Sequence, residues 1–224
     1  MGRILRIDVG GEIYHVLNRA NARMTIFRKQ KDFEAFENIL EEAKDRYSMR
    51  ILSYQIMPNH WHFCLYPRNN GDLVAFMGWL TLTHTQRWHA HYRTMGTGHL
   101  YQGRYKSFLV QKDIYFLQLC HYIESNALRA KLVKRAEDWR WSSLWRREYG
   151  TDEQKGLLYP WPVVEPENYS KWINQPQIEN ELEQIRTSIF KSRPYGEEMW
   201  LNKMVKKFDL EITLRQPGRP KNGS

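Results

Sequence analysis

The stretch from Met57 to Tyr66, which reads Met-Pro-Asn-His-Trp-His-Phe-Cys-Leu-Tyr, constrains the fold and chemistry of this chain more than any other. Successive side chains of a β-strand point to opposite faces, so a strand here places His60 and His62 on one face and Trp61 and Phe63 on the other. Two imidazoles on one strand face can reach the same divalent ion, and the bulky residues behind them anchor the strand. The stretch therefore predicts half of a metal site.

Apolar residues elsewhere alternate between strand spacing and helical spacing. The pattern predicts strands over residues 13–19, 50–56, 60–66 and 105–110, and helices over residues 32–47, 72–89 and 113–128. The resulting order is strand, helix, strand, strand, helix, strand, helix. This order predicts a ferredoxin-like α+β fold, an antiparallel sheet with helices over one face.

Two local features of these elements can also be predicted. Alternation within the second strand places Leu52, Tyr54 and Ile56 on one face. Asp72 and Asp113 each precede a helical apolar stripe and are expected to cap their helices at the N-terminus.

The length of 224 residues suits one domain of about 150 residues with an appendage. Proline and tryptophan cluster near residue 160, and two short helices are predicted over residues 177–190 and 197–208. We therefore expect a functional domain over residues 1–150 and a helical, basic appendage over residues 151–224.

The net charge restricts the class of partner. The chain carries 34 Lys and Arg residues against 25 Asp and Glu residues, a formal charge of +9. A polyanion such as nucleic acid is the expected partner. A basic surface that faces only solvent would explain the same excess of Lys and Arg.

The two cysteines, Cys64 and Cys120, both lie within apolar patterns and are expected to be buried thiols in a reducing compartment. The charged N-terminus does not resemble a signal peptide, and no apolar run is long enough for a membrane span. We expect a cytoplasmic location and no membrane partner.

The helix predicted after the last strand could complete the metal site. Tyr122 and Asn126 are four residues apart and share one helix face. A phenol is a weak nucleophile at neutral pH, but a divalent ion on a phosphate oxygen activates the phosphorus for attack. This set suits phosphodiester cleavage by a tyrosine, although Glu124 or His121 could replace Asn126 as the third ligand.

The histidine pair and the tyrosine also have structural interpretations. A His-x-His pair on a strand is often incidental, and Tyr122 could be a half-buried aromatic residue. His15 shares its strand face with Ile13 and Leu17 and is expected to be a structural histidine.

Single-stranded nucleic acid is usually held by cationic grooves and stacking aromatic rings. Candidates for this role lie on a polar helix face, in the glycine-rich loop over residues 94–104 and directly after that loop: Arg87, Tyr101, Arg104, Tyr105 and Lys106. The two tyrosines could instead pack beneath the loop. Arg219 lies in a Gly-Arg-Pro triplet that resembles an AT-hook core, or belongs to an ordinary basic tail.

Several ordered blocks resemble a known family. The first block, residues 57–62, is similar to the His-hydrophobic-His signature of HUH endonucleases. Four further blocks resemble, in order, those of the REP-associated tyrosine transposases, relatives of the single-tyrosine insertion-sequence transposases: Tyr-His-Val-Leu-Asn-Arg (14–19), Tyr-Gln-Gly-Arg-Tyr-Lys-Ser (101–107), Tyr-Ile-Glu-Ser-Asn-Ala-Leu-Arg-Ala (122–130) and Trp-Arg-Trp-Ser-Ser (139–143).

The resemblance implies a role for each residue of the candidate site. His60 and His62 bind a divalent metal, Mg²⁺ or Mn²⁺, Tyr122 is the nucleophile, and Asn126 completes the metal site. The family cleaves and rejoins single-stranded DNA at palindromic hairpins, and leaves a 5′-phosphotyrosine and a free 3′-hydroxyl. Ala127 departs from the family, which usually has proline there.

Two other functions are considered. A hairpin-binding protein without cleavage would form no covalent adduct with DNA. A zinc-dependent hydrolase would use the histidine pair to activate water, would need a third acidic or histidine ligand, and would not need Tyr122. The sequence does not distinguish a monomer from a homodimer.

Overall fold

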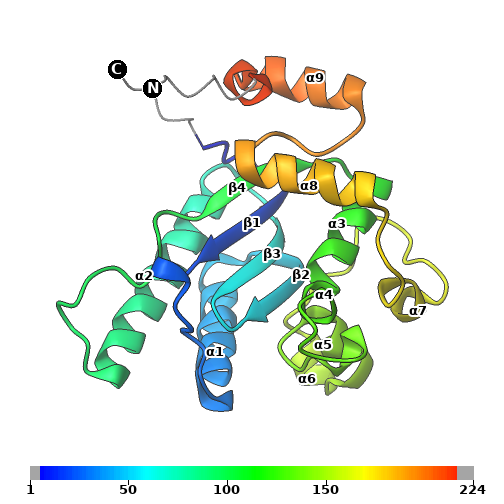
Figure 1. Ribbon diagram of the computed structural model, residues 1–224. Helices are drawn as coiled ribbons and strands as arrows, with labels where there is room; N and C mark the ends of the chain where they lie inside the picture. Colours follow the sequence, from blue (N-terminus) through cyan, green and yellow to red (C-terminus); the bar gives the residue numbers. More distant parts are fainter. Residues whose placement is uncertain (1–5, 216–224) are drawn as a thin grey trace, which may run out of the picture.

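A four-stranded antiparallel sheet forms the centre of the computed structural model, which describes residues 6–215 (Figure 1). The strands lie in the order β2-β3-β1-β4. Their bounds are β1 Ile13–Arg19, β2 Arg50–Met57, β3 His60–Tyr66 and β4 Lys106–Val110. With one helix after β1 and one after β3, this order confirms the predicted ferredoxin-like α+β fold.

Helices α1 (Gln30–Tyr47) and α2 (Asp72–Tyr92) cover one face of the sheet, as predicted. Phe36 and Leu40 of α1 pack with Trp61 and Phe63 of β3 in a single buried cluster. Burying large apolar side chains contributes about 1.5–3 kcal/mol each. This layer therefore holds β3 from behind and leaves its histidines to the opposite face.

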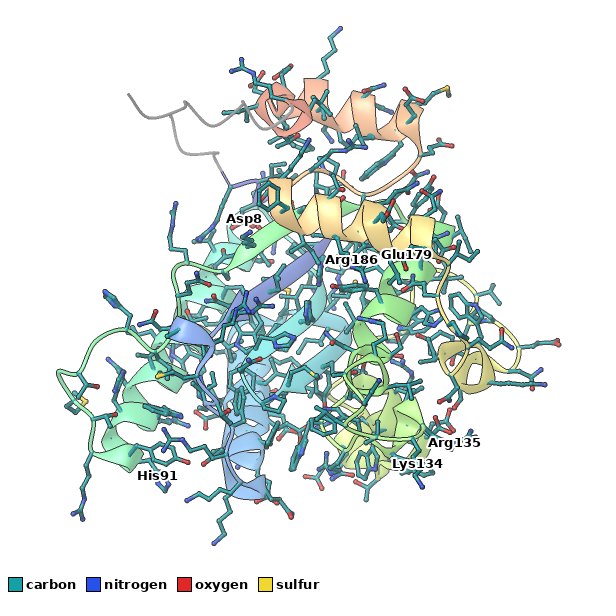
Figure 2. The ribbon with its side chains drawn as sticks, viewed as in Figure 1. Asp8, His91, Lys134, Arg135, Glu179 and Arg186 are labelled. Carbon is teal, nitrogen blue, oxygen red and sulfur yellow. The ribbon has the colours of Figure 1, made fainter. Side chains whose placement is uncertain are left out.

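The second face, which carries the histidines, is covered by elements that follow β4. Helices α3 (Ile114–Glu124) and α8 (Glu179–Lys191) pack there (Figure 1). Leu182 and Ile185 form the buried stripe of α8, whereas Arg186 and Glu179 form an exposed ion pair (Figure 2).

The helix predicted over residues 113–128 is interrupted near its end. It divides at Ser125 into α3 and the short helix α4 (Asn126–Arg129). Gln55 of β2 fills the break: its Oε1 accepts from the amide of Ala127 (2.7 Å), and its Nε2 donates to the carbonyl oxygens of Ile123 (3.0 Å) and Glu124 (2.9 Å). A fully buried amide thus ties the break to the strand beside β3.

Of the two expected caps, one is confirmed and one is wrong. Asp113 accepts a hydrogen bond from the amide of Tyr115 (2.9 Å) at the start of α3. The N-cap of α2 is Gly71 rather than Asp72, because the carboxylate of Asp8 accepts from the amides of the first turn of α2. A partner 65 residues away replaces the local cap.

The expected face of Leu52 is also wrong. A β-bulge between Ile51 and Ser53 shifts the register of β2 against β3. Leu52 therefore packs in the cluster under α3, while Tyr54 packs under α1.

Segments that follow β4 cover both edges of the sheet. Along β2, the amide of Ile56 donates to Trp141 O (2.9 Å) and the amide of Tyr159 donates to Ile51 O (2.8 Å). Along β4, the carbonyl oxygen of Tyr195 accepts a hydrogen bond from the amide of Gln111 (2.9 Å), and the amide of Tyr195 donates to the carbonyl oxygen of Leu109 (2.8 Å).

The chain after residue 140 is helical. It contains α5 (Ser143–Tyr149), α6 (Asp152–Lys155), α7 (Tyr169–Ile173) and α9 (Glu198–Lys207) in addition to α8. Short 3₁₀ turns occupy Asn21–Arg23, Ala136–Asp138 and Glu211–Leu214. A domain boundary near residue 150 stays a prediction.

Two further expectations concern the cysteines and membranes. Cys64 and Cys120 are free and buried. Within residues 6–215, none of the helices combines the length and apolar character that crossing a bilayer requires.

Candidate functional site

His60 and His62 lie side by side on the face of β3 that α1 and α2 leave uncovered. Their ring centroids are 5.1 Å apart and their planes are nearly perpendicular. The side chain of His62 is buried, with 3% exposure, and that of His60 is half-buried. The predicted strand thus presents both imidazoles together, one at the surface and one beneath it.

Each histidine uses its Nδ1 atom for an internal hydrogen bond. Nδ1 of His60 lies 2.6 Å from Oδ1 of Asn59, and Nδ1 of His62 lies 2.9 Å from Nε2 of His15. These contacts fix the ring orientations through Nδ1, so that Nε2 is the atom of each ring that could bind a cation, an arrangement typical of metal-binding histidines. His15, expected to be only structural, therefore supports the candidate site directly.

Both imidazoles are held in the neutral form. Burial lowers the pKa of His60 to about 4, with Arg19 and Arg129 lowering it further. Burial also lowers the pKa of His62 well below its usual value, and the neighbouring histidines act in the same direction. Neutral rings keep the lone pairs that coordinate a cation.

Tyr122 and Asn126 come from α3 and α4 to the same place. The ring of Tyr122, which is half-buried, lies 5.9 Å from the ring of His62, nearly at right angles to it. Nδ2 of Asn126 lies 3.5 Å from Nε2 of His60, and a half-turn of the amide group would place its oxygen there instead. The structure thus brings together the four residues predicted for cleavage.

The proposed alternatives to Asn126 as third ligand face elsewhere. Glu124 is fully buried and accepts from Ser53 (2.9 Å) and Tyr169 (2.8 Å), and it also pairs with Arg147. His121 is buried and Nε2 contacts the carbonyl oxygen of Gln175 (3.1 Å). Within residues 6–215, no group of three His, Cys, Asp or Glu side chains could hold a metal ion.

The donor set that fits a cation is therefore two neutral imidazoles and one amide oxygen. Imidazole suits Mn²⁺ and the heavier divalent metals, and an amide oxygen also suits Mg²⁺. Three uncharged donors leave the full charge of the ion, and several coordination positions, for a substrate. His60, His62 and Asn126 fit such an ion.

Arg129 is a residue of this site that the sequence reasoning missed. Its guanidinium carbon lies 4.4 Å from the centroid of the Tyr122 ring, and its Nη1 donates to Oγ of Ser125. Burial lowers the pKa of Arg129, whereas Tyr122 raises it. The spacing of seven residues from Tyr122, two helical turns, is the one sequence signal that could have indicated it.

Two of the predicted DNA-binding residues border the site. Arg104 and Lys106 line a cleft of about 340 Å³ together with Arg19 and His60. Arg19 pairs in register with His60 on the neighbouring strand. The cleft therefore joins the candidate metal site to a row of cations, so a basic path leads away from it.

The other predicted DNA-binding residues lie elsewhere. Tyr101 is buried under the opposite face of the sheet, where its hydroxyl bonds to Trp61 (3.0 Å) and His84 (2.7 Å). Tyr105 is also buried. Arg87 forms a two-bond ion pair with Glu42 between α2 and α1. Arg219 falls outside the described residues.

Comparison with known proteins identifies the family. Residues 9–126 match the family model described as "Transposase IS200 like". The chain belongs to the IS200-like transposase family. The matched residues contain the strand with both histidines, and also Tyr122 and Asn126.

One solved structure supports the fold of this transposase, and a second, more distant one is also similar to part of the chain. A structure described as a REP-associated tyrosine transposase bound to a REP hairpin shares 18% sequence identity, with a TM-score of 0.53 over 73% of this chain and 92% of that one. A putative transposase from Deinococcus radiodurans is 15% identical, with a TM-score of 0.39 over 59% of this chain and 91% of that one. No curated protein matches the chain.

Proposed function

We propose that this transposase is a metal-dependent endonuclease and strand transferase that cleaves and rejoins single-stranded DNA at palindromic hairpins. The observation that carries the proposal is the convergence of Tyr122, His60, His62 and Asn126 on one point of the sheet face. The family assignment and the hairpin named for the similar structure agree with a DNA substrate. A cytoplasmic location is part of the same proposal.

Three residues would hold the cation that such chemistry needs. His60 and His62 offer their Nε2 atoms and Asn126 its amide oxygen to Mg²⁺ or Mn²⁺. When bound, the cation withdraws charge from a non-bridging oxygen of the scissile phosphate. The contacts of His60 with Asn59 and of His62 with His15 keep the two rings in place for this role.

Tyr122 would act as the nucleophile. Its phenolic oxygen forms a bond to phosphorus while the bond from phosphorus to the 3′ oxygen breaks. The phenol loses its proton, and the 3′ oxygen leaves as a hydroxyl. The 5′ phosphate remains on Tyr122 until a 3′-hydroxyl of the same or another strand attacks it and rejoins the DNA.

The first experiment is to incubate the protein with an end-labelled hairpin oligonucleotide and Mn²⁺ or Mg²⁺, followed by denaturing electrophoresis. We expect an adduct that survives denaturation. Tyr122→Phe should abolish the adduct while hairpin affinity stays within about twofold, because a phenyl ring keeps the packing. The matched control is Tyr149→Phe, since Tyr149 is an exposed tyrosine on α5.

The outcomes separate the functions considered above. A wild-type protein that binds the hairpin and forms no adduct would be a binding protein without cleavage. An adduct that persists in Tyr122→Phe would assign the nucleophile to another residue. His60→Ala and chelation of the metal should each prevent the adduct, and cleavage that survives both would contradict the metal site.

A further inference from the structure

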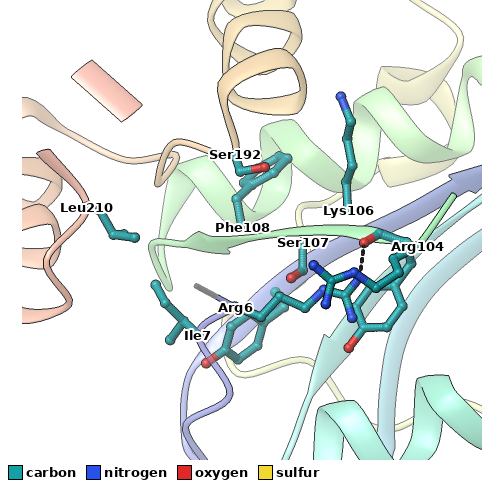
Figure 3. Close-up of a pocket in the computed structure, with 10 residues that line it drawn as sticks. Arg6, Ile7, Arg104, Lys106, Ser107, Phe108, Ser192 and Leu210 are labelled. Carbon is teal, nitrogen blue, oxygen red and sulfur yellow. Dashed lines mark hydrogen bonds between the residues drawn. The ribbon is translucent and has the colours of Figure 1, made fainter. Parts of the chain in front are cut away.

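A second cleft lies over the outer edge of β4, beside the cleft that contains His60. It has a volume of about 250 Å³ (Figure 3). Its polar lining comprises Arg6, Arg104, Lys106, Ser107 and Ser192 together with the rings of two tyrosines, and Ile7, Phe108 and Leu210 form apolar walls. The lining contains cations and hydroxyl groups and no carboxylate, which indicates an anionic ligand.

The backbone of β4 adds a donor to this cleft. The carbonyl oxygen of Leu109 and the amide of Gln111 both bond to the backbone of Tyr195. The backbone groups of residues 109 and 111 therefore point away from β1, past the free edge of the sheet. Backbone groups of an antiparallel strand alternate in direction with a period of two residues. The amide of Ser107 therefore points outward too, beside its own hydroxyl.

Arg6 is held rigidly at the mouth of this cleft. Its guanidinium carbon lies 3.9 Å from the centroid of the Tyr105 ring, and its Nη2 donates to the carbonyl oxygen of Tyr105 (3.0 Å). Figure 3 shows Arg6 and Arg104 on the same side of β4 as Ser107, whereas Lys106 and Ser192 lie on the other side. A guanidinium has five N–H donors, and the bond to Tyr105 uses one of those on Arg6.

The cleft is connected to the candidate active site. Arg104 and Lys106 line both this cleft and the one that contains His60 and Arg19. Burial lowers the pKa of Lys106, and the charge of the nearby Arg19 lowers it further. A polyanion that passes from His60 around β4 would neutralise both groups of cations.

We propose that the cleft of Arg6, Arg104, Ser107 and Ser192 is a subsite for one phosphodiester group of the DNA strand, near the phosphate that Tyr122 attacks. This inference rests on the proposed function. Two guanidinium groups, the hydroxyl of Ser107 and its outward amide match the oxygen atoms of a phosphate, and arginine forks bind such oxygens in pairs. The subsite would fix the register of the strand relative to Tyr122.

The test combines variants of the protein with variants of the DNA. Hairpin oligonucleotides with flanking single strands would each carry one neutral methylphosphonate at a successive position. With wild-type protein, we expect one position to weaken binding about tenfold. Arg6→Gln should weaken binding of unmodified DNA by a similar factor and lose all sensitivity at that position.

Salt dependence gives a second readout. Removing one phosphate contact should reduce the slope of log K against log salt by about 0.7 for a single strand. Arg104→Gln should act in the same way as Arg6→Gln. Lys134→Gln is the matched control, because Lys134 is an exposed cation remote from β4 (Figure 2).

The outcomes that overturn the subsite differ from those that overturn the nuclease. Affinity and salt slope unchanged in both arginine variants, or position-specific sensitivity retained in Arg6→Gln, would exclude the subsite even if the wild type forms an adduct. A cleft that takes only free phosphate would give this same result. An absent adduct with intact position-specific binding would instead exclude cleavage and keep the subsite.

Discussion

The rings of His15, His62 and Tyr122 lie in mutual contact, with centroid distances between 5.1 and 6.4 Å. Nε2 of His15 lies 2.9 Å from Nδ1 of His62, so one of these nitrogens donates a hydrogen bond to the other and the bond holds the two rings together. The candidate nucleophile therefore rests on a rigid histidine pair on one side and on Arg129 on the other.

Arg129 should matter for the rate of cleavage more than for binding. If Tyr122 is the nucleophile, as proposed, the positive charge of Arg129 beside its ring would stabilise the negative charge that develops on the phenolic oxygen and the phosphate. Arg129→Gln should slow adduct formation roughly 10²-fold in single-turnover measurements at saturating DNA. Arg129→Lys keeps the charge and should retain most of the rate, so equal rates for Gln, Lys and wild type would contradict this role.

Alternation along a strand is a local property, and it predicted the shared face of His60 and His62 from the sequence alone. The contacts of Arg129 with Tyr122 and of His15 with His62 could not be predicted in the same way. The first depends on where α3 breaks, and the second joins residues 47 positions apart. The position of Tyr101 could not be predicted either. The local sequence does not show whether an aromatic residue in a loop stacks on a nucleic-acid base or packs in the core.

Among the elements, the break between α3 and α4 determines where Asn126 lies. Gln55 replaces the helical hydrogen bonds lost at Ser125 with three bonds from the sheet. Ala127 supplies one of the three through its amide, and a proline there would have no N–H to donate. Alanine at position 127, where the family usually has proline, therefore allows the hydrogen bond from the amide of residue 127 to Gln55.

Gln55→Leu should destabilise the protein. Leucine keeps most of the volume but leaves the amide of Ala127 and the carbonyl oxygens of Ile123 and Glu124 without their partner, in a fully buried site. We expect a loss on the order of 3 kcal/mol in the free energy of unfolding, measured by urea titration.

The control for this variant is Gln184→Leu, an exposed glutamine on α8, which should change stability by less than about 0.5 kcal/mol. A similar small change for Gln55→Leu would show that the three bonds contribute little.

The type and order of the main elements were predictable because long apolar stripes at helical or strand period dominate those segments. Their ends depended on distant partners. Asp113 caps α3 as its local sequence indicates, whereas Asp8 takes the place of the expected cap at α2. The β-bulge in β2 could not be recognised in the sequence, because both faces of the sheet are buried and an apolar residue such as Leu52 suits either one.

At the scale of the whole molecule, acid should weaken folding through His84. It is buried at 4% exposure, bonds to Tyr101 (2.7 Å) and stacks on Phe27. Burial lowers its pKa to about 3, against about 6.5 in an unfolded chain. The unfolded state therefore binds more protons between these values, and the stability from neutral His84 is lost as pH falls from about 6.5 towards 3.

The slope of unfolding free energy against pH should thus contain a contribution of about 1.4 kcal/mol per pH unit in that range. Urea titrations at several pH values would measure it. His84→Gln should remove this contribution. His91→Gln, at an exposed histidine of the same helix (Figure 2), should leave the slope unchanged, and equal slopes in all three proteins would contradict the prediction.

The arrangement of the four strands could be predicted from the order of helices and strands along the sequence, since few topologies join them without crossing connections. The path of residues 140–215 could not be predicted from the sequence, because the helices in this segment are short and their positions depend on the surfaces that they cover. The ion pair of Glu124 with Arg147 and the hydroxyl of Tyr169 illustrate this, since three separate helices meet in one buried network.

The backbone pairing of Tyr159 with β2 and of Tyr195 with β4 has a consequence for how the protein behaves at high concentration. Outer strands with bare amides and carbonyls recruit other chains and seed aggregates. Here the chain's own later segments occupy much of both borders. Release of either segment would uncover a template for intermolecular strand pairing, so damage to this region should first become visible as precipitation.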